Sequence, residues 1–298
     1  MNKTRTIIIS LSILLSLLIA ALAVGYVYLT HETAGSFFDS GGARIRYTDE
    51  GTGVPVILVH GFAVNADLNW RRPGILQSLA KEYRVIAMDL RGHGLSDKPH
   101  EEDKYGFEMA LDVIRLMDHL KIKKAHLVGY SFGGFIALKL AATHPERFFT
   151  VSPCAAGWEK PEESQFFAAL GKMAQDLRAG RSVGPVISSF GDNRKKPGMI
   201  HEIWVRLLTG YLNDSQALAA LLGNLRDFGL SEEEVRGIEV PMLGIVGSRD
   251  PLLLGAQNLV GFAPNYKLVI VDGTDHIKTP MHDDMIKTLQ EFLRSHSG

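Results

Sequence analysis

The chain has 298 residues, of which 46% are hydrophobic, so it can form one large α/β domain or two small ones. Its formal net charge is -1 and no basic tract occurs in the body of the chain, so nucleic acid is not an expected partner. The one cysteine, Cys154, excludes an internal disulfide framework and a cysteine-rich metal site. We expect neither a cofactor nor a bound metal.

The N-terminus differs from the rest of the chain. Lys3 and Arg5 precede an almost unbroken apolar run over residues 7–29, which is long enough to span a bilayer as a helix. The run also resembles a secretory signal, with the small-x-small sequence Ala21-Leu22-Ala23 as a cleavage site. The next positive residue after the run is Arg44, so the positive-inside rule places the globular part outside the cytoplasm. We expect it to be membrane-anchored, or released to the periplasm or exterior after cleavage.

Beyond residue 35, short apolar runs alternate with helical patterns. The segments around Gly41-Gly42 predict an opening β-hairpin. Later runs are apolar at consecutive positions, which is typical of strands covered on both faces. The predicted strands are 43–49, 56–59, 84–88, 125–128, 148–151, 242–246 and 266–271. Apolar residues at helical spacing predict helices over 67–82, 107–120, 135–142 and 281–293.

Residues 154–236 depart from this alternation. They contain no convincing strand, and their helical candidates, 162–178, 198–210 and 215–225, are short. We therefore divide the chain into a signal or anchor at 1–30, an α/β core at 36–153 and 237–295, and a helical insertion at 154–236. The core is predicted to be a mostly parallel, doubly wound sheet.

Several polar residues fall just past predicted strand ends. Ligand sites in such sheets lie at the carboxyl ends of the strands, so these residues can converge on one edge. They are His60, Asp89, Ser131, Asp250 and His276.

Residues 128–134, Val-Gly-Tyr-Ser-Phe-Gly-Gly, contain a G-x-S-x-G motif centred on Ser131. A strand pattern precedes the motif and a helical pattern follows it. A serine on so sharp a turn adopts a strained backbone, and Gly129 and Gly133 remove the clashes that Cβ atoms would make. The start of the helix directs free N–H groups and the positive end of its dipole toward the serine. The motif therefore predicts Ser131 as a nucleophile.

A serine nucleophile needs a histidine base, and the base needs an orienting carboxylate. His276 fits best as the base because it follows the last predicted strand. His60 and His93 are rivals on the same edge, and we interpret His60 as positioning the Gly61-Phe62 turn.

The orienting carboxylate should come from another strand end. The loop after 148–151 has no carboxylate, whereas the loop after 242–246 contains Asp250. Asp275 adjoins His276 and is expected to point elsewhere, and Asp272 is less favoured. The oxyanion needs two aimed donors, for which we expect the backbone N–H groups of Phe62 and Phe132.

Together these segments resemble a serine-nucleophile α/β-hydrolase over roughly residues 36–295. The matching stretches are 58–62, 89–96, the serine motif, 144–148, 247–250 and His276. The order Ser131, Asp250, His276 is the chain order of that arrangement. The resemblance implies an eight-stranded sheet that begins with an antiparallel hairpin, and a helical lid at 154–236. Related dehalogenases and epoxide hydrolases use an aspartate nucleophile, and Ser131 argues against both activities.

The expected pocket lies between the sheet edge and the lid. Phe62, Phe132, Trp158, Leu252 and Ile277 follow the catalytic loops and would provide apolar walls, whereas we assign Trp204 and Phe166-Phe167 to packing within the lid. The sequence has no cationic cluster near the site, so it gives no reason to expect an anionic substrate.

The leading hypothesis is a serine hydrolase that cleaves an ester of a small or medium apolar molecule through an acyl-enzyme. C–C bond hydrolysis of a vinylogous diketone by the same triad is the alternative. A non-catalytic envelope binding protein is a third hypothesis, which the complete triad disfavours.

Overall fold

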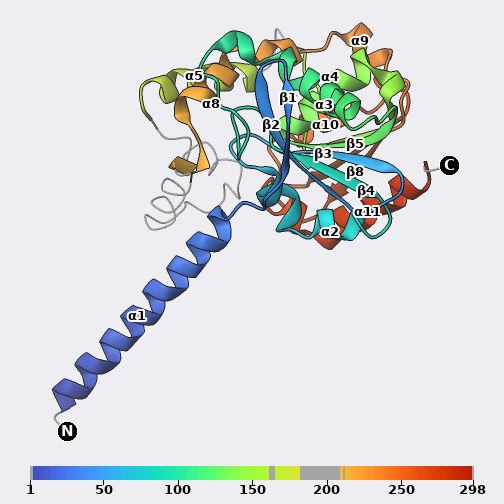
Figure 1. Cartoon of the computed structure of the whole chain (residues 1–298). Helices are drawn as coiled ribbons and strands as arrows, with labels where there is room; N and C mark the ends of the chain where they lie inside the picture. Colours follow the sequence, from blue (N-terminus) through green and yellow to red (C-terminus); the bar gives the residue numbers. More distant parts are fainter. Residues whose placement is uncertain (1–2, 161–164, 182–208, 211, 297–298) are drawn as a thin grey trace. The chain divides into compact units, whose positions relative to one another are not determined.

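The computed structural model describes residues 3–160, 165–181, 209–210 and 212–296. It divides the chain into two compact units, Met1–Thr33 and Ala34–Gly298 (Figure 1). The first unit consists mainly of helix α1 (Lys3–Thr30). Its segment Ile9–Tyr28 is long and apolar enough to cross a membrane, and none of this segment is buried within the protein.

The second unit is built on one eight-stranded sheet, in the order β1-β2-β4-β3-β5-β6-β7-β8. Antiparallel pairing joins β1 to β2 and β2 to β4, and every other neighbouring pair is parallel. The predicted sheet and its opening hairpin are thus confirmed. The strands are β1 (Ser36–Ser40), β2 (Ala43–Glu50), β3 (Pro55–Val59), β4 (Arg84–Met88), β5 (Ala125–Tyr130), β6 (Phe148–Cys154), β7 (Met242–Gly247) and β8 (Tyr266–Val271).

The central strands are buried on both faces because successive side chains enter two different apolar cores. In β3, Ile57 and Val59 belong to one core, whereas Val56 and Leu58 belong to the other. The alternation arises because successive side chains of a pleated strand point to opposite faces of the sheet. The continuous apolar run over 56–59 is therefore explained by helices on both sides of the sheet.

Helices cover the two faces in separate groups (Figure 1). One face packs against α3 (Phe107–His119) and α4 (Phe132–Thr143), and the other against α2 (Ile75–Leu79) and α11 (Asp283–Arg294). In α11, Met285, Leu289 and Leu293 are buried, in keeping with the spacing of one helix face. The remaining described α-helices are α5 (Gln165–Arg178), α8 (Ser215–Gly223), α9 (Glu232–Arg236) and α10 (Leu253–Asn258).

The single helix expected over 67–82 is wrong, because the structure has two short elements there. A π-helix, η1 (Asp67–Arg71), comes first and α2 follows. Pro73 lacks an N–H, and Gly74 adopts a left-handed conformation with φ 84°, so the chain turns between them.

The segment between β6 and β7 contains helices and no strand in its described part. Helices α5 and α8 contact each other, and α8 also contacts the short helix η2 (Glu102–Lys104). The helix expected over 198–210 lies outside the described residues except for its last two, and so does Trp204. Phe166 and Phe167 belong to α5, but their side chains lie outside the described part of the structure.

The second residue of strand β5 is a fully buried histidine, His126. His126 Nδ1 lies 2.7 Å from Thr150 Oγ1 on β6, and its ring contacts those of Phe149 and Tyr83. Burial, with a smaller effect from the charge of His296, lowers the pKa of His126 to about 4. The folded protein therefore holds this ring neutral at a pH at which the unfolded chain protonates it.

This difference predicts an acid-sensitive fold. Because the unfolded chain takes up the proton first, stability is lost as the pH falls from about 6.5 to about 4. Replacing the ring in His126→Leu should make the free energy of unfolding less pH-dependent in this window, by about 1 kcal/mol per pH unit. Urea titrations of both proteins across the window measure the slopes, and equal slopes would contradict the prediction.

Candidate active site

Ser131 stands on a strained turn between β5 and α4. Its backbone has φ 54° and ψ -117°, which a residue with a side chain rarely adopts. A Cβ on Gly129 would overlap the Gly133 carbonyl, and a Cβ on Gly133 would overlap the backbone at the end of β3. The Ser131 N–H donates to the Cys154 carbonyl at 2.9 Å, which ties the turn to β6. The glycines therefore permit the turn, and the neighbouring strands hold it.

Asp250 and His276 meet at the carboxyl ends of β7 and β8. The Asp250 Oδ2 atom lies 2.8 Å from His276 Nδ1, and both side chains are buried. The other carboxylate oxygen accepts the Leu252 N–H at 2.9 Å. Because both oxygens are engaged, the carboxylate is fixed in orientation and holds the imidazole through its Nδ1 atom.

Tyr130 links the serine turn to the histidine loop. It precedes Ser131 on β5, and its hydroxyl donates to the His276 carbonyl at 2.6 Å. The Tyr130 and His276 rings are also in contact, with centroids 5.3 Å apart. Burial, followed by the nearby negative charge of Asp250, raises the pKa of Tyr130 well above its usual value, so the hydroxyl stays protonated as a donor. The sequence carries no signal for this role, because Tyr130 occupies what looks like an ordinary apolar strand position.

The two rival carboxylates are engaged elsewhere. Asp275 accepts the N–H groups of Ile277 and Lys278 at 3.0 and 2.9 Å and so forms the turn after His276. Asp272 is exposed and accepts a hydrogen bond from the Ser248 hydroxyl. Among these carboxylates, the described contacts place Asp250 on the imidazole.

Asp89 binds backbone groups of two loops and makes no described contact with His276. It is fully buried and accepts the N–H groups of Ala66 at 2.9 Å and Leu95 at 3.1 Å. Burial raises the pKa of Asp89, while the guanidinium of Arg46, 3.5 Å away, acts in the opposite direction. The carboxylate thus joins the loop after β3 to the loop after β4.

The rival histidines are also buried, and their ring nitrogens contact the backbone. His60 Nδ1 lies 2.7 Å from the Gly61 carbonyl and its Nε2 accepts the Leu90 N–H at 2.9 Å. His93 Nε2 accepts the Ala63 N–H at 3.1 Å. Burial lowers the pKa of His60 to about 4 and that of His93 well below its usual value. These rings therefore support the loop after β3 and have no nitrogen left to act as a base toward Ser131.

The loop that contains Phe62 lies against the serine. A Cβ on Gly61 would lie 3.2 Å from Ser131 Cβ, so the backbone approaches the nucleophile closely there. Phe62 is half-buried and its ring contacts His93, while the Phe132 ring contacts Phe228. Among the backbone hydrogen bonds of the described turns and loops, none has the N–H group of Phe62 or Phe132 as its donor.

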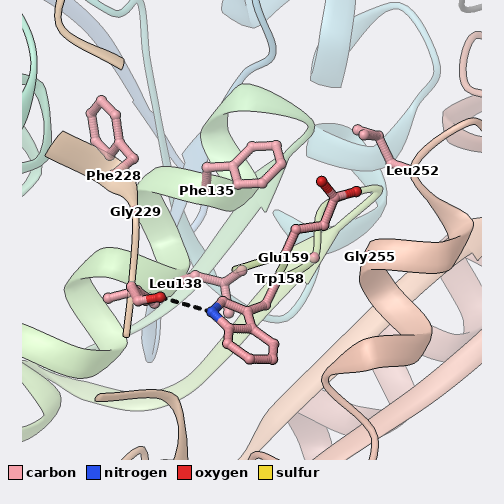
Figure 2. Close-up of a pocket in the computed structure, with 10 residues that line it drawn as sticks. Phe135, Leu138, Trp158, Glu159, Phe228, Gly229, Leu252 and Gly255 are labelled. Carbon is pink, nitrogen blue, oxygen red and sulfur yellow. Dashed lines mark hydrogen bonds between the residues drawn. The ribbon is translucent and has the colours of Figure 1, made fainter. Parts of the chain in front are cut away.

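A pocket beside α4 and α10 brings together two of the residues expected to contact substrate, Trp158 and Leu252 (Figure 2). Phe135, Leu138 and Phe228 provide further apolar wall, and Trp158 Nε1 donates to the Leu230 carbonyl at 2.8 Å. Its lining includes neither Ser131 nor His276, and it also lacks the expected wall residues Phe62, Phe132 and Ile277, of which Ile277 is exposed.

In the described residues, no group of three or more histidine, cysteine, aspartate or glutamate side chains is placed to hold a metal ion. Chemically, the arrangement offers a hydroxyl on a strained turn, a carboxylate-oriented imidazole and two backbone donors at one sheet edge.

Comparisons with known proteins identify relatives of this arrangement. A family model described as the alpha/beta hydrolase fold matches residues 54–180. A pimeloyl-[acyl-carrier protein] methyl ester esterase of Aliivibrio fischeri (strain MJ11) is 30% identical over 266 residues, which cover 85% of this chain and 98% of that protein. A 2-hydroxymuconate semialdehyde hydrolase of Pseudomonas sp. (strain CF600) is 43% identical over 109 residues, 36% of this chain and 38% of that protein.

A solved structure adds a comparison of the whole fold. The 2-hydroxy-6-oxo-6-phenylhexa-2,4-dienoate hydrolase of Rhodococcus sp. strain RHA1 has a TM-score of 0.69 and 26% identity, over 88% of this chain and 99% of that one. The sheet order described above, the family match and the nearly complete alignment with the Aliivibrio protein agree. The chain belongs to the α/β-hydrolase family and is a hydrolase of that type.

Proposed function

We propose that this protein is a serine hydrolase that cleaves a carboxylic ester of a small or medium apolar substrate. The observation that carries the proposal is the 2.8 Å contact between Asp250 and His276 at the sheet edge that also presents the strained Ser131. The resemblance to a methyl ester esterase over 85% of the chain supports the ester as the substrate class.

In the proposed mechanism, the Ser131 hydroxyl attacks the ester carbonyl carbon while His276 Nε2 takes its proton. Asp250 holds the imidazole through Nδ1 and balances the charge that forms on it. The Phe62 and Phe132 N–H groups stabilise the oxyanion. Collapse of the tetrahedral intermediate breaks the bond to the alcohol, which leaves with the proton from His276. Water, deprotonated by His276, then releases the acid and regenerates Ser131.

The substrate pocket follows from the same placement. We propose that Trp158 and Leu252 form its apolar wall, that Phe62 and Ile277 lie at its mouth, and that residues 154–236 cover it as a lid. Trp158 and Leu252 line one pocket in Figure 2, which supports placing them on a common wall. Apolar walls with few polar groups favour an acyl or alcohol part that is itself apolar.

C–C bond hydrolysis is the second candidate. It uses the same three residues on a vinylogous diketone, and the relative that is 43% identical over 109 residues is named a 2-hydroxymuconate semialdehyde hydrolase. That match spans 38% of the relative, so it supports the reaction class less strongly than the esterase match supports ester hydrolysis.

Three predictions follow from the proposed function, and the first concerns the triad. A fluorophosphonate probe should label Ser131 in the folded wild type and should not label Ser131→Ala. Asp250→Asn should lower kcat by about 10⁴-fold, because it favours the wrong tautomer of His276. The matched control is Asp272→Asn, which removes the same charge from an exposed neighbouring loop and should leave kcat within about twofold. Absence of label at Ser131 in the folded wild type would sink the proposed function.

The second prediction separates the two reactions. We expect p-nitrophenyl esters to be hydrolysed with a higher kcat/KM than a ring-cleavage product of the vinylogous diketone type, and Ser131→Ala to abolish both activities. A series of short, medium and long acyl chains then defines the ester preference. A higher kcat/KM for the diketone would reverse the assignment in favour of C–C hydrolysis.

The third prediction concerns location. We propose that the hydrolase unit acts outside the cytoplasm, because Ile9–Tyr28 is long and apolar enough to span a membrane and positive charge precedes it. Cell fractionation followed by N-terminal sequencing should find the protein either in the membrane with residues 1–23 retained or released with Val24 first. Intact protein in the cytoplasm, with Lys3 and Arg5 still present, would contradict export.

A further inference from the structure

Three consecutive peptide groups after β3 are held by three buried side chains. The Gly61 N–H donates to Asn69 Oδ1 at 2.9 Å, and the Gly61 carbonyl lies 2.7 Å from His60 Nδ1. The Ala63 N–H donates to His93 Nε2 at 3.1 Å. His60, Asn69 and His93 are all buried, so their contacts are shielded from competing water.

These contacts orient the one N–H group between them. No peptide bond in the described residues is cis, and in a trans peptide the carbonyl and the N–H point in opposite directions. Because His60 fixes the Gly61 carbonyl, it also fixes the direction of the Phe62 N–H on the far side of the same peptide. Asn69 and His93 engage the N–H groups of the residues on either side. The Phe62 N–H is left available at the point where Gly61 approaches Ser131.

The hydrogen bonds also determine the tautomer of each histidine. His60 Nε2 accepts the Leu90 N–H, so the proton lies on Nδ1 and is donated to Gly61. His93 Nε2 accepts the Ala63 N–H, so its proton lies on Nδ1, 3.2 Å from the Arg91 carbonyl. The two rings are in edge contact with centroids 5.2 Å apart. Each ring must be neutral to accept its N–H, and burial keeps both rings neutral.

Asn69 reaches the loop from an unusual element. It lies in the π-helix η1, and π-turns of this kind occur frequently at functional sites. Asp67, in the same turn, contacts the half-buried Arg71 at 2.7 Å and the buried Arg46 at 3.7 Å, so two ion pairs anchor the element. Ala63, on the other side of Phe62, has φ 58°, a left-handed conformation that only a well-held segment maintains. The loop is therefore fixed at both ends.

We propose that Asn69 and His93 are positioning residues that, together with His60, aim the Phe62 N–H at the oxyanion. The proposal rests on the proposed serine hydrolase function and adds the groups that preorganise its oxyanion hole. Neither residue touches the reacting atoms. Their effect is to keep the peptide from rotating, since a donor stabilises an oxyanion only when it is already aimed.

The test uses the full chain in detergent with p-nitrophenyl butyrate as substrate. Asn69→Leu and His93→Leu remove the acceptor, whereas His93→Gln keeps an acceptor oxygen near the position of Nε2. The matched control is His126→Leu, which removes a buried neutral histidine from the opposite end of the strands. Each variant is titrated to completion with a fluorophosphonate, so that kcat is expressed per labelled Ser131 and unfolded protein is not counted.

We expect kcat per labelled serine to fall about tenfold to hundredfold in Asn69→Leu and His93→Leu, with KM changed less than about threefold. Affinity for an alkyl boronic acid, which forms a tetrahedral adduct on the serine, should fall by the same factor as kcat/KM. His93→Gln should recover most of the loss, and His126→Leu should lower the melting temperature without changing kcat per labelled serine.

Two outcomes overturn the proposal. Unchanged kcat per labelled serine in both leucine variants would show that the Phe62 N–H needs no such support. Equal losses in His93→Gln and His93→Leu would show that the acceptor is not what matters. Failure of the proposed function has a different signature, because the wild type itself would then neither label at Ser131 nor turn over the ester, and the oxyanion hole would be overturned with it.

Discussion

The strained backbone of Ser131 is the constraint on which the rest of the site depends. Its φ of 54° costs on the order of 1–3 kcal/mol, so the surrounding structure must hold it. Helix α4 packs against β5 and β6, and the Cys154 carbonyl accepts the Ser131 N–H. Each glycine of the motif lies where a Cβ would collide with a neighbouring segment. The turn is therefore a product of the packing of the whole central sheet.

Buried polar contacts hold the loops in place, as the apolar cores hold the strands. Arg91 forms a two-pronged contact with Asp112 on α3, at 2.7 and 2.6 Å, and Ser40 on β1 donates to the same carboxylate. Asp89 joins two loops through backbone N–H groups. Pairs of this kind are costly to break because each partner would be left charged and dry. They keep the loops at the carboxyl edge of the sheet in one arrangement.

Much of the fold could be predicted from the sequence because local patterns report it directly. Continuous apolar runs indicate strands covered on both faces, and Gly129 and Gly133 around Ser131 specify a sharp turn. The structure places Asp250 on His276, in keeping with the absence of a carboxylate from residues 152–156, which follow the predicted strand 148–151. These features are local in sequence or follow from the order of strand ends.

Other features depend on contacts between distant segments, and sequence patterns do not report them. The π-helix at 67–71 and the break at Pro73 and Gly74 interrupt what looks like one amphipathic helix. Asn69 is a polar residue of the helix expected over 67–82, and nothing local in the sequence indicates burial. In the structure it is buried and accepts the Gly61 N–H. Tyr130 reads as one more apolar strand residue, and only the arrival of the His276 loop gives its hydroxyl a partner.

The seam between β6 and β7 joins the two parts of the proposed triad. The two strands are paired in register at Val151 and Met242, and the Ala155 N–H donates to the Ile245 carbonyl at 2.8 Å. Ser131 lies on one side of this seam, and Asp250 and His276 lie on the other. Local opening in proteins begins where buried apolar contacts are few. Both apolar cores contain residues from each side of this seam, so an opening that separated nucleophile from base would also disrupt the cores, and catalytic competence is lost together with the fold.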